Sequence, residues 1–116
     1  MQIFRYSIEG DGIKDFIDLL KREFMTSYSY MNQGKDTIIL VSERYSFLQN
    51  SDMAAVIVVD ILNDRACNLE LIVAGGRTGI FRLDIYGREK ATLKSIKELV
   101  EKLCNEKGLR IISFGP

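Results

Sequence analysis

The first 24 residues show two hydrophobic patterns with different periods. In "IFRYSI" apolar and polar residues alternate, which places Phe4, Tyr6 and Ile8 on one side and predicts a strand. From residue 13 onward the apolar residues are three and four positions apart, which predicts a helix with one buried stripe. Asp11 is the expected N-cap of that helix. The stripe consists of Ile13, Phe16, Ile17, Leu20 and Phe24.

The middle of the chain predicts a meander of antiparallel strands. Residues 27–31 fit either the end of the helix or a short strand, because Tyr28 and Tyr30 alternate with other residues ahead of a turn at Gly34. Three β-rich runs follow, separated by the turn-forming stretches "LQNSD" and "NDRA". These runs are "TIILVSERYSF", "MAAVIVVDIL" and "CNLELIVA".

Two of the three runs differ in their pattern. "NLELIVA" alternates, with Leu69, Leu71 and Val73 on one side, as expected for a strand with one face in water. "AAVIVV", at residues 54–59, does not alternate. We therefore expect both faces of that run to be buried in a central strand.

The stretch after the glycines of residues 75–79 alternates again. "IFRLDIY", at residues 80–86, directs Phe81, Leu83 and Ile85 to one side, which predicts another strand. Gly87 is expected to turn the chain from this strand into a second helix.

The last thirty residues predict a helix and a closing strand. Gly108 is a suitable C′ residue for this helix, and "LRIISF" then reads as the final strand. The apolar stripe of the helix consists of Leu93, Ile96, Leu99, Val100, Leu103 and Cys104.

This order of elements predicts an α+β fold. Segregated strands with a helix near each end favour a two-layer sandwich, in which two helices cover one face of a largely antiparallel sheet of about five to seven strands. The plan, β-α-β-meander-α-β, is analogous to a split β-α-β arrangement widened by a meander. With 47% hydrophobic and 28% charged residues and no linker, residues 1–116 are expected to form a single domain.

The composition argues against several classes of function. Sixteen basic and sixteen acidic residues cancel, so we expect neither nucleic acid nor a membrane as a partner. The absence of histidine excludes histidine-based catalysis and most zinc sites, and we expect no metal and no cofactor. Cys67 and Cys104 suit buried free thiols, and with no apparent signal peptide they favour a cytoplasmic location.

The most cationic part of the chain contains the candidate site. From Arg77 to Lys97 there are six basic residues and two acids, so glycine backbone and arginine side chains could bind an anion at the loop and rim between Gly75 and Lys90. A strand is expected directly after the glycines, however, which matches no phosphate-binding motif and favours a simple hairpin. The candidate ligand-binding residues are Gly75, Gly76, Arg77, Gly79, Arg82, Asp84, Gly87 and Arg88.

Acid chemistry is the remaining catalytic possibility. Asp60, Asp84 and Glu89 could act as a paired acid and base if the fold brought two of them together, but the sequence shows no such pairing. For Asp60 a turn or capping role is favoured. Whether the protein is an enzyme stays open, and the catalytic residues are unknown.

The central strands suggest how the protein associates. Either Ala54, Val56 and Val58 or the alternate set of Met53, Ala55, Ile57 and Val59 must point away from the helices, together with Ile72 and Ile80. An apolar sheet face of this kind indicates an interface or a ligand cavity. We favour a non-enzymatic self-associating or interaction module that forms a homodimer through this face. The alternative is a small-molecule binder or enzyme with the anion site described above.

Overall fold

The computed structural model describes residues 1–43, 54–74 and 82–114, and for residues 82–88 it describes the backbone alone. The chain forms the α+β fold expected from the sequence. In chain order the elements are β1 (Gln2–Glu9), α1 (Ile13–Glu23), β2 (Tyr28–Met31), β3 (Thr37–Ser42), β4 (Ala54–Asn63), β5 (Ala66–Ala74), α2 (Arg82–Glu106) and β6 (Arg110–Phe114).

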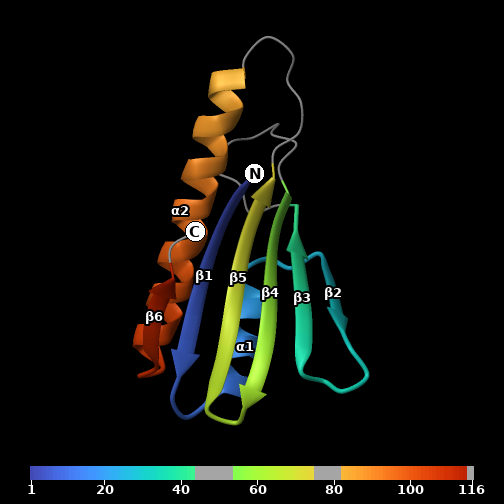
Figure 1. Cartoon of the computed structure of the whole chain (residues 1–116), viewed down its shortest axis with the longest axis vertical. Coiled ribbons are helices and arrows are strands. Elements are labelled where there is room, and N and C mark those ends of the chain that lie inside the picture. The colour runs from blue at the N-terminus through green and yellow to red at the C-terminus, as the bar shows by residue number, and fades with distance from the viewer. Residues whose placement is uncertain (44–53, 75–81, 115–116) are drawn as a thin grey trace.

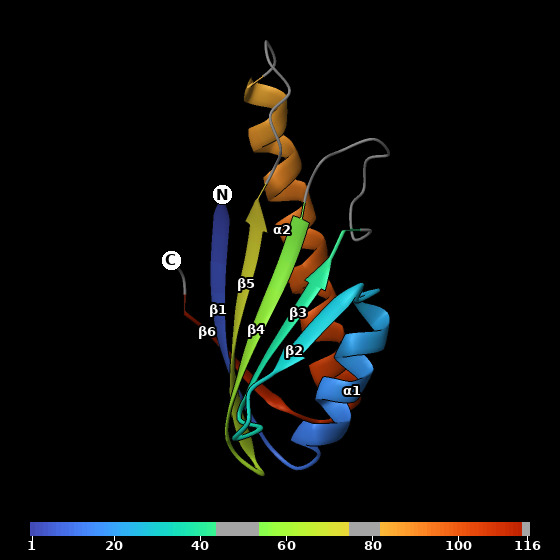
Figure 2. The same ribbon diagram turned by 90° about the vertical axis from the view of Figure 1, so that its right-hand side faces the viewer.

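Within the described residues, six strands form one sheet in the order β2-β3-β4-β5-β1-β6, and all neighbours are antiparallel. Both helices lie behind the sheet in Figure 1 and on its right in Figure 2, so they cover one face. Strands β1 and β2 run in the same direction and are separated by three others, while β5 and β6 enclose β1. Two split β-α-β units are thus interleaved, with β3 and β4 as the inserted meander.

The core lies between the sheet and the helices. The alternation predicted for β1 and β5 is confirmed, and both helical stripes contribute to this layer. Strand β4 is central, as expected, but Val56 and Val58 are only half-buried while Ile57 and Val59 are fully buried. Within the single chain only one face of β4 is therefore fully buried, because no helix of the described chain covers the second face.

Helix α1 begins differently from the prediction. Asp11 does not cap it; the N-cap is Gly12, with φ of 86° and no side-chain cap. Asp11 forms an ion pair with Arg65 in the β4–β5 turn, and the Gly10 N–H donates a 2.8 Å hydrogen bond to the Arg65 carbonyl. These two contacts hold the β1–α1 connection against the β4–β5 turn. The Asp11 carboxylate therefore pairs with Arg65 instead of capping α1.

Helix α2 is the largest correction. It begins at Arg82 and continues through Gly87, so the predicted strand over residues 80–86 is wrong from Arg82 onward, and Ile80 and Phe81 lie outside the described residues. Alternation over a short run is a weak signal, and extending a helix costs far less than starting one. Gly87 costs about 1 kcal/mol in a helix interior but does not end the helix.

The other end of α2 agrees with the sequence. Gly108 has φ of 67°, and the Leu109 N–H donates to the Cys104 carbonyl at 2.8 Å, which closes the helix as a C′ glycine does. Residues 28–31, for which the sequence allowed either a helix or a strand, form β2.

Candidate functional site

The predicted anion site is described only in part. Gly75, Gly76, Arg77 and Gly79 lie outside the described residues. The other four candidates are backbone positions in α2: Arg82, Asp84, Gly87 and Arg88. Asp84 and Arg88 are four residues apart in this helix. Gly87 lies within α2, so the expected strand-to-helix turn at this residue is wrong. The anion site as a whole remains a prediction.

The candidate acids that the structure describes are not brought together. Asp60 is exposed near the C-terminal end of β4, where its Oδ1 accepts a hydrogen bond from the Thr37 hydroxyl at 3.2 Å. Glu89 is 5% exposed on α2, where its Oε2 lies 2.8 Å from the amino group of Met1. Asp60 faces away from the helices and Glu89 belongs to the helix layer, so they form no acid–base pair.

The sheet face that points away from the helices, called the open face here, has a continuous apolar row. Strand pairing places one apolar residue of each of five strands side by side, from the β2 edge to β1. Figure 1 is viewed toward this face, with the helices behind it. The row consists of Tyr28, Val41, Val56, Ile72 and Ile3.

The next row is apolar on one half only. Tyr30, Ile39 and Val58 continue the apolar surface across β2, β3 and β4, and the row ends in Glu70 and Arg5. The Arg5 Nε donates to Glu70 Oε2 at 2.8 Å, so these two charges neutralise each other. The open face therefore joins an apolar area to a polar area in which Arg5 and Glu70 form an ion pair.

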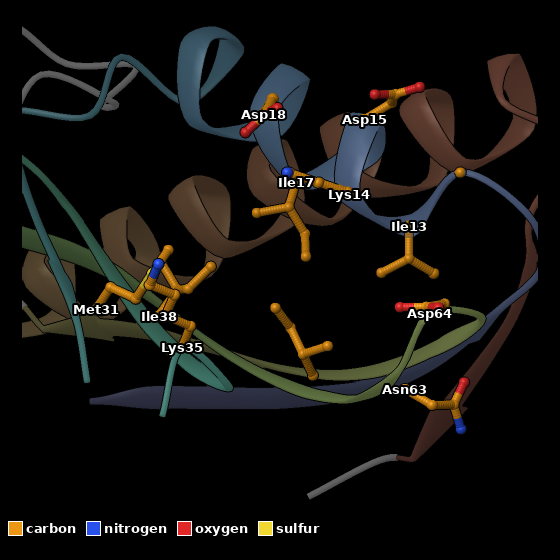
Figure 3. A pocket seen from close by; sticks show the side chains of 12 residues that line it. Ile13, Lys14, Asp15, Ile17, Asp18, Met31, Lys35, Ile38, Asn63 and Asp64 are labelled. Carbon is orange, nitrogen blue, oxygen red and sulfur yellow. The ribbon is translucent and has the colours of Figure 1, made fainter. Parts of the chain in front are cut away.

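A groove lies on the opposite face of the sheet, between α1 and strands β2 to β4. It has a volume of about 640 Å³, within the range of small-ligand sites, about 300–1,000 Å³. In Figure 3, Ile13 and Ile17 point from α1 into this groove, and Ile38 and Met31 lie on the sheet side. Ile61 of β4 completes the apolar floor.

Charged side chains surround the apolar floor of the groove. Lys14 comes from α1, and Lys35 comes from the turn between β2 and β3. Neither lysine has an ion-pair partner in the described ranges of the chain. Asp15, Asp18 and Asp64 also line the groove, so acidic side chains outnumber the two lysines in its lining.

The two cysteines are free and buried, as the sequence suggested. Burial raises the pKa of the Cys67 thiol to about 12. For Cys104, burial and then the nearby Cys67 and Glu101 raise the thiol pKa to about 12 as well. Since the thiolate is the reactive form, neither cysteine is prepared to act as a nucleophile at neutral pH.

The described residues contain neither a cluster suited to a metal ion nor a helix suited to a membrane. Over residues 1–43, 54–74 and 82–114, no group of three or more cysteine or acidic residues could hold a metal ion. None of the helices in this part of the chain is both long and apolar enough to cross a membrane. The chain matches no protein-family model, no curated protein and no solved structure.

The groove was not predicted from the sequence. Its residues are spread over α1, two turns and the strands β2 to β4, and no local motif connects them. The sequence does show that Ile13 and Ile17 belong to the apolar stripe of α1. The spacing of such a stripe is the same, however, whether the helix packs closely on the sheet or stands partly away from it.

Proposed function

We propose that the protein is a non-enzymatic self-associating module in which two copies pack through their open faces. The observation that carries this proposal is the apolar row from Tyr28 to Ile3, which crosses five of the six described strands. A contiguous apolar surface on a protein of this size is characteristic of an interface. Two sheets can pack face to face about 10 Å apart with their side chains interdigitated.

The charges of the open face suit a second copy as the partner. In a two-fold dimer each patch meets itself, so an unpaired charge near the axis would face its own copy. Arg5 and Glu70 form an ion pair within one chain, and Asp60, which accepts a hydrogen bond from Thr37, lies two rows away from the apolar row. The formal net charge of zero also removes long-range repulsion between copies.

The size of the face is adequate if most of it takes part. Six strands about 4.8 Å apart and eight residues of about 3.3 Å each outline roughly 600 Å² before side-chain relief is included. A stable interface buries about 800 Å² on each partner. The apolar row alone is smaller than that, so the paired polar residues are expected to form the rim around it.

Two tyrosines at the β2 edge are the expected anchors. Tyr28 and Tyr30 are 61% and 49% exposed, and their partners in β3 place both on the open face. Tyrosine contributes a large contact area at low entropic cost and is enriched among the residues that dominate binding energy.

The test is the mass in solution by light scattering across a dilution series. We expect twice the chain mass of 13.2 kDa for the natural sequence and a monomer for the double variant Tyr28→Asp/Tyr30→Asp. Ser29→Asp is the matched control, since Ser29 is also exposed on β2 but points to the opposite face. A natural protein that is monomeric throughout would overturn the proposal. Dissociation by Ser29→Asp as well would assign the contact to the β2 edge instead.

A cytoplasmic location is part of this proposal. Its support is that both cysteines are free and buried, which suits a reducing compartment.

A further inference from the structure

We infer that the free edge of β2 pairs with the same edge of a second copy, so that two sheets join through antiparallel strands. β2 is the last strand on one side of the described sheet, and among the described strands it pairs with β3 alone. The contact uses backbone groups of an edge, whereas the proposed dimer uses side chains of the open face. The inference therefore goes beyond the proposed function and does not depend on it.

The edge of β2 is accessible in the described part of the chain. β2 is the outermost strand on the right of Figure 1, where α1 lies behind β4 and β5 and α2 lies on the opposite side. In Figure 2, which is viewed toward this edge, no helix of the described chain crosses β2. All four residues of β2 are exposed. A second strand can therefore reach the edge without displacing a helix.

The sequence of β2 lacks the features that protect most sheet edges from pairing. Exposed edges usually contain lysine, proline or a bulge. From Thr26 to Asn32 there is no charged residue and no proline, and β2 pairs with β3 without a register shift. By contrast β6, at the other edge of the described sheet, begins with the exposed Arg110. Of these two edges, β2 is the one open to pairing.

Pairing within the sheet determines which backbone groups of β2 point outward. The Asn32 N–H donates to the Thr37 carbonyl at 3.1 Å. Residues bonded to one neighbour alternate along an antiparallel strand, so Tyr30 also bonds to β3. Ser29 and Met31 therefore direct their N–H and C=O groups toward the free edge.

A second copy fits this edge because the edge is complementary to itself. With Tyr30 on a two-fold axis, Ser29 lies opposite Met31 of the second copy, and each such pair exchanges two hydrogen bonds. The two Tyr30 side chains then form a cross-strand aromatic pair. Since the edge has no charge, no like charges meet across the axis, and a charged peptide would find no opposite charge there.

The contact is expected to be weak. β2 has only four residues, and their exposed parts are far smaller than the roughly 800 Å² that each partner buries in a stable interface. We therefore expect edge pairing at high chain concentration, where it adds to any contact through the open face. The two-fold axis is perpendicular to the sheet, so both open faces stay on the same side.

A disulfide across the edge tests the register. Cα atoms of a hydrogen-bonded antiparallel pair lie about 5.5 Å apart, which suits a disulfide. Glutathione disulfide is the oxidant, and each new disulfide reduces it to two glutathione molecules. We expect Ser29→Cys/Met31→Cys to form at least about fivefold more covalent dimer than either single variant, whose cysteine has no cysteine opposite. The natural sequence is the control, since Cys67 and Cys104 are buried.

A backbone variant tests the hydrogen bonds. Ser29→Pro removes an outward N–H and keeps the bonds to β3, and proline is tolerated on edge strands. By light scattering, the mass of the natural protein should rise at high concentration above its value in dilute solution. Ser29→Pro should abolish this rise, whereas Ser29→Ala, which keeps the N–H, should not.

A variant of the open face separates this inference from the proposed function. Ile72→Asp, or Ile3→Asp if the first variant does not fold, changes the apolar row on β5 or β1, away from β2. Either change should leave the crosslinking of Ser29→Cys/Met31→Cys within about twofold, as expected for distant sites. A protein that is monomeric when dilute but crosslinks as expected would overturn the proposed function alone.

Four results would overturn the edge contact. Absence of a covalent dimer in the double cysteine variant would show that the edges do not pair. Equal crosslinking of the single and double variants would show random collision. Loss of crosslinking with Ile72→Asp would show that the edges meet only when the open faces do. A rise in mass that persists in Ser29→Pro would assign the association to another surface.

Discussion

The Tyr6 hydroxyl donates a 3.0 Å hydrogen bond to Oε2 of Glu101, joining the inner face of β1 to the outer part of α2. Tyr6 is buried, while Glu101 is exposed. Burial, followed by the hydrogen bond to Glu101, raises the pKa of the tyrosine hydroxyl. The pair therefore holds a neutral phenol inside the protein and sets the position of α2 above β1.

Tyr6→Phe tests this link. Loss of the hydroxyl should reduce the free energy of unfolding by about 0.5–1.5 kcal/mol, since Glu101 is exposed and can be rehydrated. Urea unfolding gives the value. Glu101→Gln is the control, because its amide oxygen can still accept the hydrogen bond. An equal loss in both variants would mean that charge, rather than the hydrogen bond, stabilises the contact.

The buried thiols predict a loss of stability in alkali. Burial raises the thiol pKa of Cys67 and Cys104 from 9.0 to about 12, so between these values the unfolded chain releases protons that the folded chain retains. The stability that the two buried neutral thiols contribute is complete below pH 9 and is lost as the pH rises toward 12. Each thiol reduces the free energy of unfolding by up to about 1.4 kcal/mol per pH unit in that window.

The measurement is the free energy of unfolding at intervals from pH 7 to 11 under reducing conditions. Cys67→Ala/Cys104→Ala should have lower stability at pH 7, because each truncation leaves a small cavity, but a flatter pH dependence. An unchanged slope in the double variant would assign the alkaline loss to other groups, such as Tyr6.

The glycines before α1 differ in what surrounds them. Gly10 and Gly12 both have positive φ, of 140° and 86°, so alanine is strained at either position. At Gly10 an added Cβ would also lie 2.8 Å from Cδ2 of Leu109, whereas nothing lies within 4 Å at Gly12. Gly12→Ala should cost about 1–2 kcal/mol, and Gly10→Ala about 1 kcal/mol more, because the Leu109 methyl group can move only partly aside.

Thermal or chemical unfolding of the two variants provides the comparison. Adding Leu109→Ala to each variant removes the atom in question. If the excess cost of Gly10→Ala remains in that background, the close contact is not its cause.

Met25 offers a stabilising change. It follows the C-cap Phe24 of α1 in a left-handed conformation, with φ of 55°, and its side chain is half-exposed. Met25→Gly should raise the free energy of unfolding by about 0.5–1 kcal/mol through relief of this strain. Met25→Ala is the control that keeps the strain, so an equal gain from alanine would point to the side chain instead.

The sequence predicted most of the fold because single-sided burial leaves a clear period. Leu69, Leu71 and Val73 alternate, and the stripe that includes Ile96 and Val100 repeats at helical spacing, so these two elements and their inner faces could be predicted. The start of α2 could not, since Arg82 to Tyr86 alternate over too few residues to exclude a helix.

The candidate surfaces were predictable to different degrees. Two helices can cover only one face of a sheet this wide, so Val56 and Ile72 on the other face are half-buried. An apolar outer face was therefore expected before its register was known. Lys14 and Asp64 are fifty residues apart in the chain and line one groove only because α1 lies over the β4–β5 turn. Such long-range placement leaves no local pattern.

The interleaving of the strands has a consequence for how the chain folds. Among the described strands β1 pairs only with β5 and β6, so once β1 has been made it has no hydrogen-bonded neighbour among them until more than fifty further residues have followed. Contacts this distant in sequence slow folding into the range of about milliseconds to seconds, because a large loop must close before they form. Until then the meander of β3, β4 and β5 can form from local hairpins, and β1 docks onto it afterwards.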